Sequence, residues 1–133
     1  MHPFRQAVEA REFDRIGELF AEHAVLNSPI AFRPYQGRET VAAIVRIVAS
    51  VLEDFAYQRS IGAETDDDHA LVFGARVGDL SIQGCDFLHT DADGLIDEIT
   101  VMLRPLKAVQ AFEEQMRPKF AAAMANLQDD AHG

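Results

Sequence analysis

Residues 55–104, FAYQRSIGAETDDDHALVFGARVGDLSIQGCDFLHTDADGLIDEITVMLR, contain four stretches in which apolar and polar side chains alternate. Polar turns separate them, at Asp66-Asp67-Asp68, at Gly78-Asp79 and at Asp91-Ala92-Asp93-Gly94. Alternation is typical of strands that bury one face, and turns of this length join neighbouring strands as hairpins. The stretch therefore predicts an antiparallel meander with strands at 55–62, 71–77, 82–90 and 95–104.

An amphipathic helix precedes the meander. Its apolar residues recur at helical spacing: Val41, Ile44, Val45, Val48 and Leu52. Gly37 stands just before this segment, and Glu39 lies in its first turn, where a negative charge suits the helix dipole. Because many of its residues are β-branched and lower its intrinsic helix propensity, burial of the apolar face has to stabilise it.

The two ends of the chain also follow a helical pattern. Residues 4–22 predict two short helices, or one helix with a kink, and a short strand pair follows at 24–26 and 30–32. Residues 33–37 have turn chemistry. After Pro105 one helical face is apolar, with Leu106, Val109, Phe112 and Met116, which predicts a helix that Pro118 interrupts.

This order of elements predicts an α+β fold, a curved antiparallel sheet with helices on its concave side. A strongly bent sheet wrapped around the long helix leaves a conical cavity, where a ligand would bind. We expect a single domain over residues 1–127 and a disordered tail over 128–133.

Composition excludes several classes of function. The chain has 133 residues, of which 48% are hydrophobic and 26% charged, and its net charge is −10. The acidic balance argues against nucleic acid, no apolar run is long enough to span a membrane, and the lack of a signal sequence predicts a cytoplasmic location. The single cysteine, Cys85, excludes an intramolecular disulfide and is expected to pack as a small hydrophobe.

Four segments resemble a known family: FAEHAVLNSPI (20–30), PYQGRE (34–39), QGCDFL (83–88) and EITVMLRP (98–105). With the helix and the Asp91–Gly94 turn, they resemble the nuclear transport factor 2-like superfamily, in its SnoaL-like branch, over roughly residues 4–117. The resemblance implies a cystatin-like conical half-barrel. It does not fix an activity, since the superfamily contains isomerases, cyclases, hydratases, epoxide hydrolases and binding proteins.

The resemblance also implies a homodimer through the outer face of the sheet. That face carries Phe87, His89, Thr100, Met102 and Arg104 if the strands alternate regularly. An apolar sheet face normally needs a cover. The alternative is partial coverage by the C-terminal helix.

Within this superfamily, ketosteroid isomerase uses an aspartate base, a tyrosine donor and a protonated aspartic acid. Aligned through Pro29 and Gly94, these three positions correspond here to Ser28, Phe4 and Asp86. Serine is a weak base and phenylalanine has no proton to donate. Ketosteroid isomerase activity is therefore not expected.

Asp86 is the candidate catalytic residue. It shares a strand face with Ile82, Gly84 and Leu88, which predicts a carboxyl among apolar neighbours. Such surroundings raise the pKa of a carboxyl, so that it acts as a general acid or hydrogen-bond donor near neutral pH. The alternative is a carboxylate that is hydrogen-bonded to a neighbour or faces solvent.

Ten further residues are predicted to bind the ligand. They are Phe4, Asn27, Ser28, Phe32, Tyr35, Phe73, Leu88, Ile99, Val101 and Leu103. For Asn27 and Ser28 the alternative is hydrogen bonding within the turn, and for Phe32 and Tyr35 it is simple packing. The five histidines show no metal-ligand spacing and no glycine-rich phosphate loop occurs, so we expect no metal and no cofactor.

Three functions remain open. The chain is a binding domain for a small apolar molecule, an isomerase- or cyclase-type enzyme acting on a small apolar carbonyl or cyclic compound with Asp86 as acid or base, or a dimeric protein-interaction module. The scarcity of convergent polar groups on the expected pocket face favours the binding domain.

Overall fold

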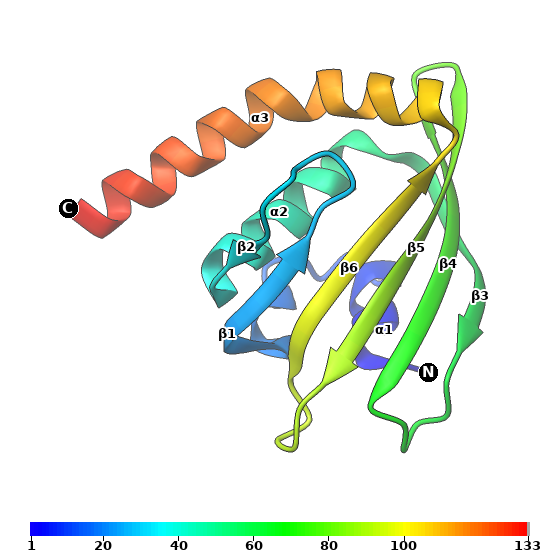
Figure 1. Ribbon diagram of the computed structural model, residues 1–133, viewed down its shortest axis with the longest axis vertical. Coiled ribbons are helices and arrows are strands. Elements are labelled where there is room, and N and C mark those ends of the chain that lie inside the picture. Colours follow the sequence, from blue (N-terminus) through cyan, green and yellow to red (C-terminus); the bar gives the residue numbers. More distant parts are fainter. Residues whose placement is uncertain (133) are drawn as a thin grey trace.

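The computed structural model describes the backbone of residues 1–132 and the side chains of residues 1–127. The meander is present as β3 (Glu53–Ile61), β4 (Asp68–Val77), β5 (Leu80–Thr90) and β6 (Ile96–Arg104). Each strand is hydrogen-bonded antiparallel to the next, which confirms the prediction (Figure 1). No helix among the described residues is both long enough and apolar enough to cross a membrane.

Two further strands complete the sheet. In the described residues its order is β2-β1-β6-β5-β4-β3, where β1 spans Phe20–Asn27 and β2 spans Tyr35–Gln36. β1 runs parallel to β6, so the sheet is mixed and not wholly antiparallel. A turn fixes the relative direction only of two strands that follow one another in the sequence. β1 and β6 come from distant parts of the chain, so no turn signal indicates that they run parallel.

The second short strand lies later than predicted. Residues 30–32 form part of a loop, whereas Tyr35 and Gln36 pair with β1. Pro29 and Pro34 bracket the loop, and proline cannot donate a ladder hydrogen bond.

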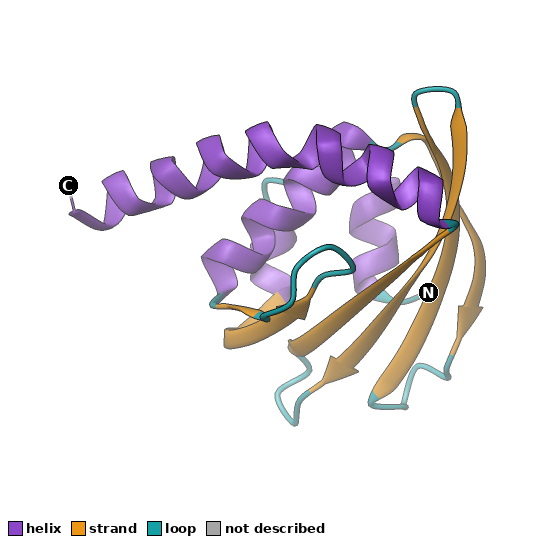
Figure 2. Ribbon diagram, turned by 45° about the horizontal axis from the view of Figure 1, so that its top comes forward, coloured by secondary structure: helices purple, strands orange, loops and turns teal. Residues whose placement is uncertain are grey.

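The amphipathic helix is α2 (Arg38–Val51), as its apolar spacing predicted. Gly37 precedes it with a φ of 103°, a conformation that side chains other than glycine rarely adopt. Val41, Ile44 and Val45 are buried in one cluster with residues of β1, β4, β5 and β6. The helix therefore packs on the concave face of the bent sheet (Figure 2).

The N-terminal segment is less helical than predicted. α1 spans Pro3–Glu9, and a short 3-10 helix spans Ile16–Leu19. Phe20 then begins β1, so residues 20–22 are strand and not helix. Phe20 is fully buried beside Phe4, which shows that its apolar side chain serves the sheet core.

α3 (Leu106–His132) begins just after β6 and continues through Pro118. The predicted interruption at this proline is wrong. Pro118 is exposed, so the carbonyl that loses its helical partner lies on the solvent side. The predicted disordered tail, 128–133, concerns residues whose side chains lie outside the described part, and it stays a prediction.

The buried face of α3 covers one end of the bent sheet (Figure 1). Ala108, Phe112 and Met116 pack with Phe73 and Ile82 in a second apolar cluster. Leu106, which was expected on this stripe, is 71% exposed. Together α2, α3 and the concave sheet enclose the space in which the site lies.

Candidate functional site

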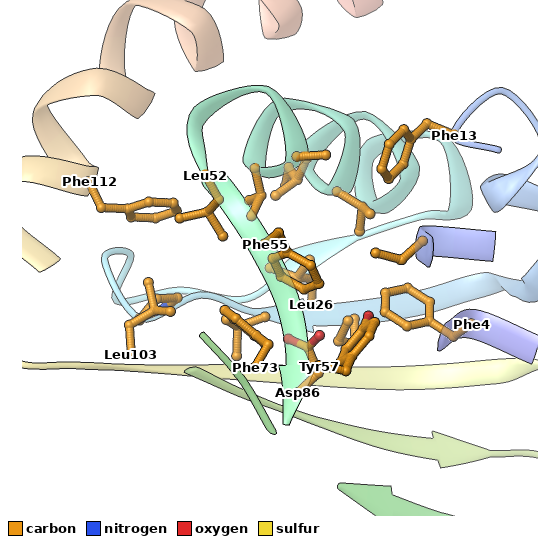
Figure 3. A pocket seen from close by; sticks show the side chains of 18 of the residues that line it. Phe4, Phe13, Leu26, Leu52, Phe55, Tyr57, Phe73, Asp86, Leu103 and Phe112 are labelled. Carbon is orange, nitrogen blue, oxygen red and sulfur yellow. The ribbon is translucent and has the colours of Figure 1, made fainter. Parts of the chain in front are cut away.

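A cavity of about 530 Å³ lies between the sheet and the helices. This volume is in the range of small-molecule sites. Phe4 and Phe112 mark its two ends, and Leu26 and Phe55 lie near its middle (Figure 3). Most of its walls are apolar, contributed by Val8, Phe13, Ile44, Val45, Val48, Ala49, Leu52, Phe73, Ile99, Val101, Leu103 and Met116.

Asp86 projects into this apolar space from the middle of β5 (Figure 3). Strand alternation buries it together with Ile82, Gly84 and Leu88. It is 7% exposed, and no other charged side chain in the described residues is buried. Burial raises the pKa of its carboxyl from 3.8 to about 7, because the charged form loses its hydration. The group is therefore partly protonated near neutral pH.

Tyr57 projects into the same cavity from β3, which is the edge strand of the meander. Its hydroxyl is buried and has no hydrogen-bond partner in the described residues. Burial, followed by the charge of Asp86, raises the pKa of this phenol, so it stays protonated. The Arg5 guanidinium lies 5.2 Å from the centre of its ring.

Three other polar side chains in the lining have partners. Glu9 pairs with Arg5 at 3.3 Å, and Asp54 pairs with Arg76 at 2.9 Å. The Ser28 hydroxyl accepts a hydrogen bond from the backbone N–H of Ile30 at 3.2 Å, which is the turn-forming alternative noted for this residue. Among the described residues, the Tyr57 hydroxyl is thus the buried side-chain atom of the lining without a hydrogen-bond partner, and Asp86 is its buried charged side chain.

Gly84 makes room for an aromatic wall. A Cβ atom at this position would lie 2.2 Å from Cζ of Phe73, which is far too close. The Phe73 ring therefore lies directly over the glycine backbone. It also packs on Phe55, with ring centres 4.8 Å apart. This stacking shapes the cavity wall next to Asp86.

The structure brings together seven of the residues selected from the sequence. These lining residues are Phe4, Ser28, Phe73, Asp86, Ile99, Val101 and Leu103. Strand alternation on β5 and β6 places Asp86, Ile99, Val101 and Leu103 there, as the sequence pattern indicated, whereas Phe4, Ser28 and Phe73 come from α1, the loop after β1, and β4.

Four selected residues lie outside the lining. Asn27 points to the other face of the sheet, where its amide donates to the Thr100 hydroxyl at 2.9 Å. Phe32 is fully exposed in its loop, and Tyr35 packs against Phe120 with ring centres 5.2 Å apart. Leu88 is buried in the core cluster that includes Phe4 and Leu26.

Sequence reasoning missed Tyr57 and the helical walls. Tyr57 alternates with Phe55 on one strand face, and this pattern is the signal that could have identified it. Phe112 and Met116 were recognised as a helical stripe, but the sequence does not say that the stripe closes a cavity.

The outer face of the sheet carries the remaining candidates. Phe87 and Met102 are exposed on this face. Cys85 is half-buried there, and burial raises the pKa of its thiol. His89 accompanies them and contacts the Asp97 carboxylate at 2.6 Å. The described residues contain no group of three potential metal ligands.

A bent six-stranded sheet with helices on its concave side and a cavity between them defines the class of α+β proteins with a cystatin-like fold. The model of the SnoaL-like domain family matches residues 2–99. The chain therefore belongs to the SnoaL-like domain family, and the predicted resemblance to SnoaL-like domains is confirmed.

Solved structures agree with this assignment. A steroid delta-isomerase from Pseudomonas aeruginosa is 34% identical over 92% of this chain and 89% of that chain, with a TM-score of 0.85. A protein with a cystatin-like fold from Silicibacter pomeroyi is 32% identical over 90% of this chain and 86% of its own, with a TM-score of 0.82.

A more distant structure is similar in fold alone. An NTF2-like protein from Cytophaga hutchinsonii is 17% identical over 77% of this chain and 84% of its own, with a TM-score of 0.58. Comparison with curated proteins gives no match.

Proposed function

We propose that this chain binds a small, largely apolar molecule in the cavity, with the Asp86 carboxyl as a polar contact. The observation that carries the proposal is a single buried carboxyl, 7% exposed, in a cavity of about 530 Å³ with mostly apolar walls. Apolar walls supply affinity, and a few polar groups fix the orientation of the ligand. The cytoplasmic location predicted from the sequence belongs to this proposal.

Calorimetric titration with an apolar aromatic compound tests the proposal. We expect measurable affinity for naphthalene derivatives, which fit the volume. Val48→Trp, which fills the space beside α2, should abolish binding, whereas Phe32→Trp adds the same indole to an exposed loop and should leave binding unchanged. Equal affinity of the two variants would contradict binding inside the cavity.

A second candidate is an isomerase- or cyclase-type enzyme with Asp86 as acid or base. It is favoured by the 34% identity to a steroid delta-isomerase, and by a pKa of about 7, which suits proton transfer near neutral pH. Against isomerisation stands Ser28, whose hydroxyl is engaged in a turn at the position where the resemblance requires a base.

Turnover measurements separate the enzyme from the binding domain. Incubation with an unsaturated steroid ketone is expected to give no double-bond migration, because no carboxylate occupies the position of Ser28. If turnover appears and Asp86→Asn abolishes it without loss of the fold, the enzyme replaces the binding domain as the better proposal.

The homodimer also remains a proposal. The C-terminal helix does not cover the outer sheet face, since its buried residues pack with residues of the inner face. Phe87 is 44% and Met102 is 56% exposed on that outer face. Sedimentation velocity should give a dimer that Met102→Asp converts to a monomer, while Leu106→Asp, at an exposed site at the start of α3, leaves the dimer intact.

A further inference from the structure

The cavity is open to solvent at the C-terminal end of α1. Three of its lining residues lie there, and we call them the rim: Glu9, Arg11 and Phe13. The side chains of Glu9 and Arg11 are exposed, whereas Phe13 is half-buried against the core. The rim is therefore a place where a ligand in the cavity still touches water.

Arg11 has a backbone conformation that arginine rarely adopts. Its φ is 56°, in the left-handed region that favours glycine. Its N–H donates to the Val8 carbonyl at 3.1 Å, and the N–H of Glu12 donates to the Ala7 carbonyl at 2.9 Å, which closes the end of α1. Glycine is the most frequent residue at this place of a helix end, because it has no Cβ atom to clash. Arginine costs stability here relative to glycine, so the helix end does not explain its presence.

The Arg11 guanidinium has no carboxylate partner among the described residues. It lies 5.2 Å from the centre of the Phe13 ring, which keeps it at the rim. Glu9 and Asp54, the other exposed charged residues of the lining, have arginine partners at 3.3 and 2.9 Å. Arg11 is thus the charged group of the lining that can pair with a ligand from outside.

The chemistry of the cavity decides where a charged group of a ligand can lie. The inner walls are mostly apolar, and burying an unpaired charge among them is costly. The rim lies across the cavity from Asp86, as the positions of Phe13 and Asp86 in Figure 3 show. The pKa of the Asp86 carboxyl is about 7, so at lower pH this group is mostly uncharged and does not repel an anion. An apolar ligand can therefore fill the interior and leave one charged group at the rim.

A carboxylate fits the rim better than a cation does. Guanidinium groups bind carboxylates through two parallel hydrogen bonds. The chain has a net charge of −10, which repels an anion unless a cation lies close to it. We propose that Arg11 binds a carboxylate at the rim, and that the ligand is an apolar carboxylic acid whose skeleton fills the cavity. This inference rests on the proposed function and adds the charged group of the ligand to it.

Two probes of similar shape test the inference. Naphthoate carries the carboxylate, and acetylnaphthalene replaces one carboxylate oxygen with a methyl group. Calorimetric titrations at pH 6 measure the Kd of both probes for the wild type and for Arg11→Gln, Arg11→Lys and Arg15→Gln. Arg15→Gln is the matched control, since Arg15 is an exposed arginine of the same segment that lies outside the cavity lining.

We expect Arg11→Gln to weaken the binding of naphthoate about fivefold, as the loss of a solvent-exposed ion pair does, and to change the Kd of acetylnaphthalene by less than about twofold. Arg11→Lys keeps the charge and should weaken naphthoate by no more than about twofold. Arg15→Gln should bind both probes as the wild type does. Added salt should weaken naphthoate alone, because it screens an exposed ion pair.

A second variant separates lost binding from lost folding. Arg11→Gly removes the side chain and suits the left-handed backbone, so the urea midpoint of the ligand-free protein should not fall. Its binding of naphthoate should weaken as much as that of Arg11→Gln. Unchanged binding of naphthoate in both variants would overturn the role of Arg11.

The remaining outcomes separate the inference from the proposed function. Equal weakening of both probes by Arg11→Gln overturns the inference, because the side chain would then only pack at the rim. Equal weakening of naphthoate by Arg15→Gln also overturns it, since net charge alone would explain the loss. If acetylnaphthalene binds and naphthoate does not, the inference fails and the proposed function stands. If neither probe binds, both fail.

Discussion

Replacing Asp86 by asparagine should stabilise this protein at neutral and alkaline pH. The folded state raises the pKa of this carboxyl from 3.8 to about 7 because burial removes its hydration. At a pH between these two pKa values, the Asp86 carboxyl holds a proton in the folded state and has released it in the unfolded state. The contribution of the carboxyl to the free energy of unfolding is therefore fully present in acid, and it is lost as the pH rises to about 7.

The size of the effect follows from the same two values. One pKa unit corresponds to about 1.36 kcal/mol, so the difference between 3.8 and about 7 amounts to about 4 kcal/mol of unfolding free energy. The asparagine side chain would not ionise, and its amide resembles a neutral carboxyl in size. We expect the variant to exceed the wild type by about 4 kcal/mol at pH 8 and to match it within about 1 kcal/mol at pH 4.

Urea unfolding followed by circular dichroism, repeated from pH 4 to pH 9, measures this difference. Asp93→Asn is the control, since it removes the same charge from an exposed turn of a chain whose net charge is −10. The reasoning is refuted if the Asp86→Asn variant and the wild type are equally stable at pH 8, or if their difference does not change with pH.

Three further predictions concern packing, charge and the last helix. Gly84→Ala should lower the free energy of unfolding by about 1–3 kcal/mol, because the new Cβ displaces the Phe73 ring; an unchanged urea midpoint would contradict this. An NMR titration should give His89 a pKa above 6.5, since its ring contacts the Asp97 carboxylate, and Asp97→Asn should lower that pKa. Pro118→Ala should slow amide exchange in α3 by restoring a helical N–H, and unchanged exchange on both sides of the position would argue against a continuous helix.

The parts of the fold that could be predicted from the sequence depend on local periodicity. α2 and the four meander strands repeat their apolar residues at the helical and strand periods. The orientation of Asp86 followed from the same rule, because it alternates with Ile82 and Leu88 on a strand with one buried face. Where one face of a strand or helix is clearly apolar, the sequence pattern determines which side chains point to the core.

The rest of the fold depends on contacts between distant segments or on solvent. Nothing in the local pattern of β1 indicates that it pairs in parallel with β6. Pro118 stays within α3 because the helix side that loses a hydrogen bond is exposed, which only tertiary structure decides. Tyr57 was missed because the register of β3 shifts between Tyr57 and Arg59, so that Arg59 pairs with Val72 of the opposite face and the alternation along the strand is broken.

The parallel pairing of β1 with β6 has a consequence for the order of folding. Phe20 pairs with Ile96 and Asn27 with Thr100, so this contact closes a loop that contains most of the chain. Contacts between distant segments carry the largest loop-closure entropy and slow folding. The meander can form by local hairpins, whereas the cavity wall at Leu26 is in place only after β1 has docked. A ligand in the cavity should therefore slow unfolding and leave the early steps of folding unchanged.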